Sequence, residues 1–152
     1  MKIYLPRPLL LTLTVFCISF MANANDQLEQ DAGSHFLQGQ KLYNGEDYIG
    51  ALPAFIRAVE LSPMSSNYHH MLGKCYGRIA EEGSWLTALR YIGKTLAEFK
   101  KAVALDDKNI QALLDLEEFY LRAPEYLGGS KSKAAEIRTQ LEKLDPGLEI
   151  HR

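Results

Sequence analysis

Histidine and cysteine side chains are common metal ligands, and His69, His70 and Cys75 lie close together in the sequence. On one helix His69 and Cys75 would face different sides, and no second close-spaced pair of ligands of the kind used by zinc sites is present. We therefore expect no metal site and no cofactor. His69 is expected to pack in the core. Cys75 is either a small buried apolar residue or a thiol available for an intermolecular disulfide or other reaction.

Catalytic motifs are missing from the sequence. It contains no Gly-x-Ser-x-Gly, no His-Glu-x-x-His and no cysteine in a catalytic context. The adjacent carboxylates Glu81 and Glu82 fall in an expected turn, where solvated charge explains them. We expect that the protein is not an enzyme.

One turn has the composition of an anion site. In residues 123–134, APEYLGGSKSKA, Pro124 is expected to end a helix, and Ser130 or Ser132 to cap the next one. Free backbone N–H groups at such a turn can hold a phosphate or carboxylate, although the spacing of a P-loop is absent. An ordinary interhelical loop is the competing interpretation. The candidate anion-binding residues are Gly128, Gly129, Ser130 and Lys131.

The first 24 residues have the pattern of a secretory signal. Lys2 and Arg7 precede the apolar run of residues 9–21, and residues 22–24, Ala-Asn-Ala, form a small-x-small cleavage signal. The run is short for a membrane span, which needs about 20 residues. We expect cleavage after Ala24 and secretion, into the periplasm of a bacterium. An uncleaved anchor is the alternative.

The charge balance is slightly acidic, with a net charge of −2 from 17 basic and 19 acidic residues. Cleavage of residues 1–24 would remove two basic residues and no acidic ones, leaving −4. This balance argues against a nucleic-acid partner, whose binders usually carry a basic patch. It gives no support for a polybasic membrane anchor, and no integral membrane segment would remain after cleavage.

A spacing of four, three and five residues recurs along the chain. Gly39 and Gly73, which are 34 residues apart, precede two of its copies. The copies are Ala51, Phe55, Ala58 and Pro63; Thr95, Phe99, Ala102 and Asp107; and Ala134, Arg138, Leu141 and Pro146.

This pattern resembles the tetratricopeptide repeat (TPR), a helix–turn–helix unit of 34 residues. The resemblance is most specific in the first unit, and the third departs from it at Glu117 and Arg138. It implies an all-α fold of three stacked helix–turn–helix units in a short right-handed superhelix, within residues 25–152. The units span about 32–65, 66–109 and 110–148. Small residues such as Gly39 would let paired helices approach, while Phe55 and Phe99 fill the gap between them.

Helical periodicity and turn residues predict six helices. Pro53 lies inside the second of them and predicts a late or distorted first turn. The second unit carries about ten extra residues and the third about five, judged against the 34-residue repeat. The first insertion lengthens a helix that starts after Ser84, and Trp85 lies at its tip. Trp85 is expected to fold onto the first helix of its unit, or else to meet a partner. The expected helices are 27–44, 48–61, 66–81, 85–105, 109–123 and 131–143.

The resemblance implies an interaction protein, because in TPR proteins the first helices of the units line a concave face where peptides bind. We therefore expect an exported adaptor or scaffold that binds a protein or peptide in the periplasm or cell envelope. Lys74 and Arg78 would suit an acidic peptide or terminal carboxylate, or form a solvated face. One alternative is a structural subunit of an envelope complex that docks through the extended end of the helix at Trp85. The other is a small protein that binds an anionic ligand at the Gly128–Lys133 turn. The expected concave face comprises Phe36, Gln40, Tyr43, Asn44, Asn67, His70, Lys74, Arg78, Gln111, Leu114, Glu118 and Arg122.

Overall fold

A computed structural model describes the backbone of residues 7–148 and the side chains of residues 26–148. The expected signal peptide, residues 1–24, lies outside the residues whose side chains are described and stays a prediction. Among the described residues, no helix is both long and apolar enough to cross a membrane.

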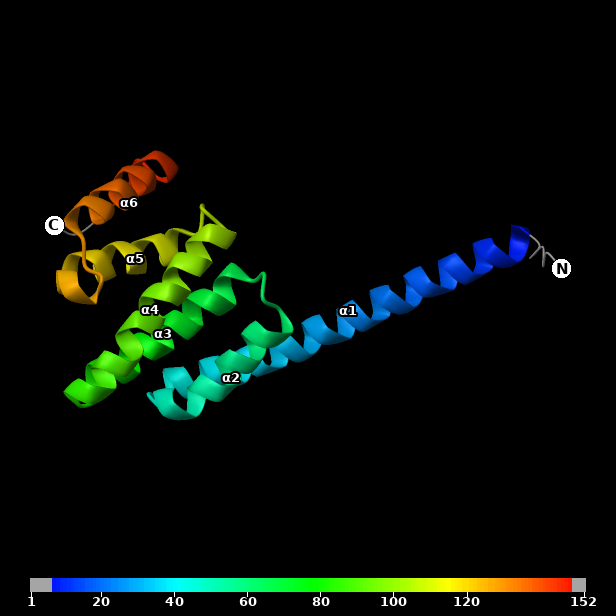
Figure 1. Ribbon diagram of the computed structural model, residues 1–152, viewed down its shortest axis with the longest axis horizontal. Coiled ribbons are helices and arrows are strands. Elements are labelled where there is room, and N and C mark those ends of the chain that lie inside the picture. The colour runs from blue at the N-terminus through cyan, green and yellow to red at the C-terminus, as the bar shows by residue number, and fades with distance from the viewer. Residues whose placement is uncertain (1–6, 149–152) are drawn as a thin grey trace.

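Residues 7–148 form α-helices that pair as successive hairpins and contain no strand (Figure 1). Helix α1 packs against α2, α3 against α4, and α5 against α6. Contacts of α2 with α3 and of α4 with α5 then join the hairpins in chain order. The elements are α1 (Arg7–Asn44), α2 (Tyr48–Leu61), α3 (Ser66–Glu82), α4 (Trp85–Leu105), α5 (Ile110–Arg122), the 3₁₀ turn η1 (Glu125–Leu127) and α6 (Lys131–Leu144).

Each helix after α1 begins at a polar residue that caps it. In every case the side-chain oxygen accepts a hydrogen bond from the backbone N–H three residues on, which would otherwise have no partner within the helix. Ser84 and Ser130 therefore cap α4 and α6 as the sequence predicted. The caps are Asp47, Ser65, Ser84, Asn109 and Ser130.

Helix α1 is longer than expected. It begins at Arg7 rather than near residue 27 and extends far beyond α2 in Figure 1. No proline or glycine occurs between Leu9 and Ala32 to interrupt it.

Pro53 does not delay the first turn of α2 as we expected, and the helix has the predicted range 48–61. The helix begins at Tyr48, where the Asp47 side chain accepts from the Gly50 N–H and its carbonyl accepts from the Ala51 N–H. The missing N–H of Pro53 would have bonded to the carbonyl of Ile49 in the first turn. Ile49 is exposed, so water can satisfy that carbonyl.

The first two hairpins are held by equivalent contacts between a glycine and a phenylalanine. A Cβ on Gly39 would lie 2.8 Å from the ring of Phe55, and a Cβ on Gly73 would lie 2.6 Å from the ring of Phe99. Both phenylalanines are buried. The 34-residue spacing in the sequence therefore corresponds to a repeated packing contact between the two helices of a hairpin.

Two buried apolar clusters run through the stacked helices. The cluster around Phe55 joins α2 and α3, with partly buried residues of α1 packed against it. The cluster around Phe99 joins α4, α5 and α6. Because no hairpin buries its apolar side chains alone, the hairpins depend on their neighbours for stability.

His69 and Cys75 both belong to the interior. Cys75 is fully buried, and its Sγ–H donates to the carbonyl oxygen of Tyr48 at 3.2 Å, which confirms the buried-residue interpretation. His69 is buried as expected, but it bridges polar groups. Its ring nitrogens lie 2.6 Å from a carboxylate oxygen of Glu98 and 3.0 Å from the carbonyl oxygen of Pro63.

Candidate functional site

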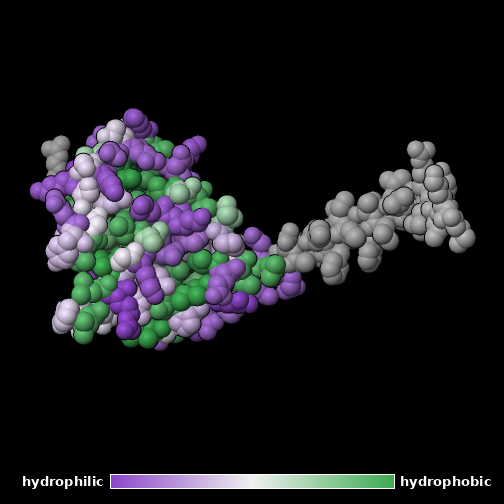
Figure 2. Space-filling view, in the orientation of Figure 1, coloured by the Kyte–Doolittle hydropathy of each residue, from purple (hydrophilic) through white to green (hydrophobic). Residues whose placement is uncertain are grey.

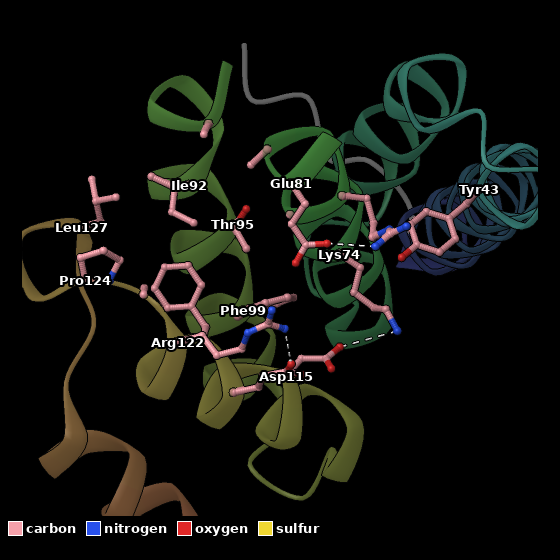
Figure 3. A pocket seen from close by; sticks show the side chains of 17 residues that line it. Tyr43, Lys74, Glu81, Ile92, Thr95, Phe99, Asp115, Arg122, Pro124 and Leu127 are labelled. Carbon is pink, nitrogen blue, oxygen red and sulfur yellow. Dashed lines mark hydrogen bonds and ion pairs between the residues drawn. The ribbon is translucent and has the colours of Figure 1, made fainter. Parts of the chain in front are cut away.

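An open pocket of about 520 Å³ lies mainly among α3, α4, α5 and the turn after α5, and Tyr43 near the end of α1 also lines it (Figure 3). We call it the groove. One of its walls is apolar and comes from Ala88, Ile92 and Phe99 of α4. Phe119 of α5 and Leu127 of η1 add apolar side chains from the neighbouring hairpin. The groove thus spans the junction between two hairpins.

Charged side chains that line the groove form ion pairs with their neighbours, and we call these side chains the rim. Lys74 of α3 lies 3.7 Å from the carboxylate of Asp115 in α5. Arg122 donates to Glu118 at 2.8 Å within α5. These exposed or half-exposed pairs contribute at most about 1 kcal/mol each to stability, so a partner can rearrange them at small cost.

Arg78 is held more firmly than the other basic residues of the rim. Its guanidinium donates to the hydroxyl of Tyr48 at 3.2 Å and to Glu81 and Glu82 at 3.0 and 3.1 Å. The hydrogen bond to Tyr48 is the largest cause that raises the pKa of Arg78. Burial raises the pKa of Tyr43, which also lines the groove, to about 12. Each of these side chains therefore keeps its charge state across the physiological range.

Five residues of the expected concave face line the groove, namely Tyr43, Lys74, Arg78, Glu118 and Arg122. The basic members already form ion pairs with carboxylates, so an acidic ligand would have to compete with those carboxylates. Other members of the expected face lie outside the groove lining, and these are Phe36, Gln40, Asn44, Asn67, His70, Gln111 and Leu114.

His70 and Phe36 are used in packing. His70 is buried, with its Nε2 2.7 Å from the Asp115 carboxylate and its ring beside Phe99. The ring of Phe36 lies 4.5 Å from that of Tyr68 and 5.8 Å from that of Phe55. Both side chains therefore contact side chains of neighbouring helices.

The apolar wall from α4 and the contribution of the turn after α5 were not predicted from the sequence. Ala88, Ile92, Pro124 and Leu127 line the groove but belong to no first helix of a hairpin. The signal was present in the two insertions, since one lengthens α4 and the other creates η1. Extra residues at neighbouring turns of stacked repeats should have indicated a shared pocket.

The turn expected to bind an anion is occupied by internal hydrogen bonds. The N–H groups of Gly128, Gly129 and Ser130 donate to the carbonyl oxygens of Glu125, Pro124 and Tyr120 at 2.9 to 3.0 Å. Gly128 has a left-handed φ of 101°, and a Cβ there would also meet Leu96. Three of the four expected anion-binding residues therefore lack a free N–H. The segment forms an interhelical turn that packs on α4.

Trp85 does not fold onto α3 as we expected. Its side chain remains 71% exposed, and the neighbouring Leu86 and Leu89 are 61% and 49% exposed. At the N-terminal end of α4, three large apolar side chains are therefore largely or half exposed.

Within the described residues no group of three or more histidine, cysteine, aspartate or glutamate side chains is placed to hold a metal ion. His69 and His70 have separate carboxylate partners on α4 and α5.

No family model and no curated relative matches this sequence. Its structure is similar to the TPR domain of OM64 from Arabidopsis, with a TM-score of 0.64 and 16% identity over 80% of this chain and 88% of that chain. It is also similar to the first TPR of Spaghetti (RPAP3) bound to the HSP90 peptide SRMEEVD, with a TM-score of 0.62 and 15% identity over 80% and 86%. A mutant of MamA gives a TM-score of 0.55 and 18% identity over 82% and 85%. The fold is that of a TPR domain.

The TPR fold places the first helix of each hairpin, α1, α3 and α5, in successive positions along the stack. Tyr43, Lys74 and Arg122 come from these three helices and meet at the groove.

Proposed function

We propose that this chain is an exported adaptor that binds a protein or peptide partner in the groove, acting in the periplasm or at the cell envelope. The observation that carries the proposal is the groove itself, a pocket of about 520 Å³ with an apolar wall at the junction of two stacked hairpins. Pockets of several hundred Å³ with apolar walls and a few polar groups are typical binding sites. The export part of the proposal rests on the pattern of residues 1–24.

A peptide-like ligand fits the shape and chemistry of this site. Apolar side chains at Ile92, Phe99 and Phe119 offer contacts to an apolar anchor, while the ion pairs at the rim offer hydrogen-bonding groups to a peptide backbone. The solved TPR of Spaghetti, which has a similar backbone, is bound to a peptide. That comparison supports a peptide as the class of ligand.

Site-specific photo-crosslinking in cells tests the proposal. A photo-reactive amino acid at Ala88, within the groove, is compared with the same amino acid at Ala135, an exposed position on α6. We expect a discrete crosslinked protein or peptide at Ala88 that is absent at Ala135. Mass spectrometry of the crosslinked product identifies the partner. Equal crosslinking at both positions, or none at Ala88, would count against the groove.

The compartment is tested separately by fractionation of cells that produce the tagged protein. We expect the processed protein in the exported fraction and a mature N-terminus at Asn25. An intact N-terminus in the cytoplasmic fraction would contradict export while leaving the groove to be judged by crosslinking.

A further inference from the structure

The outer face of α4 combines basic and apolar side chains. The helix packs against α3 and α5 through the side that carries the buried Phe99 and Ala102. On the opposite side, residues at helical spacing are all exposed. The large members of this face are Leu86, Leu89, Arg90, Lys94, Lys100 and Lys101, and the residues between them on the face are glycine or alanine.

No carboxylate offsets the positive charge of this face. Glu98, the acidic residue of α4, is turned inward, with its carboxylate 2.6 Å from the His69 ring. The ammonium of Lys94 lies 5.3 and 5.4 Å from the ring centres of Tyr76 and Tyr91. Over residues 26–148, the four basic side chains of the face take part in no ion pair. A local basic surface therefore exists on a chain whose net charge is −2.

The apolar part of the face lies at the N-terminal end of α4, where Trp85 adjoins Leu86 and Leu89. Three large apolar side chains so exposed at one tip are unusual for a surface that meets only water. Figure 2 shows hydrophobic residues at the lower left of the domain, the end at which the α3–α4 turn lies in Figure 1.

We infer that the outer face of α4 docks on an anionic lipid bilayer. In this arrangement Trp85, Leu86 and Leu89 enter the boundary between headgroups and acyl chains, and the basic side chains contact anionic headgroups. A bilayer supplies negative charge and an apolar interior along one flat surface, which matches a straight helix with both features on one side. Nucleic acid supplies the charge but no apolar region for the two leucines. The net negative charge of the chain gives no indication of this basic surface, because the basic residues of α4 are concentrated on a single face.

Binding of the purified protein to lipid vesicles tests the inference. The protein is purified from cells that produce the full chain, so it has the N-terminus that processing in the cell leaves. Trp85 is the one tryptophan of the chain, so its fluorescence reports on the tip alone. With vesicles of phosphatidylglycerol and phosphatidylcholine we expect a blue shift of the emission and co-sedimentation. With vesicles of phosphatidylcholine alone we expect a much smaller effect, and added salt should weaken binding to the anionic vesicles.

Two pairs of charge-reversing substitutions test whether vesicle binding depends on this face or only on the net charge of the protein. Lys94→Glu with Lys101→Glu should weaken binding to anionic vesicles at least about tenfold. Lys41→Glu with Lys143→Glu changes the net charge equally at exposed positions on α1 and α6 and should leave binding nearly unchanged. Leu86→Asp with Leu89→Asp should abolish the blue shift. Circular dichroism and thermal unfolding establish that each variant keeps its fold.

Several outcomes would overturn the inference. These are no blue shift with anionic vesicles, an equal shift with neutral vesicles, or equal weakening by the two pairs of reversals. A shift produced by polyglutamate but not by anionic vesicles would assign the face to an acidic protein instead, including the envelope complex considered from the sequence. Ala88→Phe, which fills the groove, should leave vesicle binding intact, so failure of the groove proposal is distinguishable from failure of this one.

Discussion

Arg138 donates hydrogen bonds to the buried carboxylate of Glu117, with its Nε and Nη2 each 2.6 Å from Oε1. By the repeat spacing, these two residues stand where the earlier hairpins have a phenylalanine and a glycine. The α5–α6 hairpin thus replaces an aromatic ring packed on a glycine with an ion pair. Both members of the contact have changed together, which explains why each departed from the repeat pattern in the sequence.

Removing Arg138 should therefore destabilise the protein strongly. Arg138→Ala leaves the carboxylate of Glu117 buried without its partner, and we expect a loss of about 3 kcal/mol in the free energy of unfolding, measured in urea. The double variant Glu117→Gly with Arg138→Phe restores the contact of the earlier hairpins and should be more stable than Arg138→Ala. A double variant as unstable as the single one would show that the third hairpin does not share the contact.

Glycine is required where the paired helices meet. A methyl group at Gly73 would lie 2.6 Å from the Phe99 ring, so Gly73→Ala should cost about 1–3 kcal/mol of stability through overpacking. Gly39→Ala should behave alike against Phe55. The matched control is Gly93→Ala on the exposed face of α4, where a Cβ meets nothing within 4 Å. That substitution should stabilise the protein by about 0.5–1 kcal/mol, and a similar effect at all three glycines would contradict the packing account.

The buried thiol of Cys75 should make the protein less stable at alkaline pH. Burial raises its pKa from 9.0 to about 12. Above pH 9 the unfolded chain loses this proton and the folded chain does not, so stability is full below pH 9 and falls above it, by about 1.4 kcal/mol per pH unit. Tyr43, raised from 10.0 to about 12, adds to the fall above pH 10.

Urea unfolding between pH 8 and 10 measures the contribution of the thiol, because its ordinary pKa of 9.0 lies in that interval. Cys75→Ala will lower stability at every pH through lost packing, but its stability should fall less steeply with pH than that of the wild type. Parallel slopes would mean that the Cys75 thiol titrates alike in both states. Native Cys75 should also resist thiol reagents until the protein unfolds.

Asn109 links the second and third hairpins. Its side chain caps α5 by accepting from the Ala112 N–H and donates to the Ser66 hydroxyl at 2.8 Å, which in turn donates to the Ala102 carbonyl oxygen at 2.9 Å. Asn109→Ala should therefore cost about 2 kcal/mol, at the upper end for loss of a cap. Ser84→Ala, at an exposed cap, should cost about 1 kcal/mol or less. Equal losses by thermal unfolding would show that the link across the hairpins adds nothing.

The bounds of the helices could be predicted well from residues close to them in the sequence. Residues 48–61 and 85–105 were predicted with the bounds that the structure has, because Asp47 and Ser84 cap their first turns and their apolar residues keep a helical period. The repeat spacing also led to the contacts of Gly39 and Gly73. The helix bounds depend on residues that are neighbours along the chain. The glycine contacts depend on a glycine and a phenylalanine that recur at a fixed spacing, and both kinds of pattern are visible in a sequence.

The surface was predicted less well, because it depends on which side chains find partners across hairpins. Lys74 was expected either to suit an acidic peptide or to belong to a solvated helix face, and its position beside Asp115 of the next hairpin could not be predicted. Trp85 was expected to fold onto the first helix of its unit, but its side chain is 71% exposed at the N-terminal end of α4. The groove wall from Ala88 and Ile92 escaped prediction for the same reason, since it follows from how two insertions meet in space.

The affinity of the crosslinked partner for two matched variants tests the central claim most directly. Ala88→Phe places a ring in the groove, and Ala135→Phe places one on the exposed surface of α6. By fluorescence anisotropy we expect binding at least about tenfold weaker for Ala88→Phe, since one well-packed anchor is commonly worth more than 1.4 kcal/mol, and unchanged binding for Ala135→Phe. Equal affinities for the two variants, with both folded, would show that the partner does not occupy the groove.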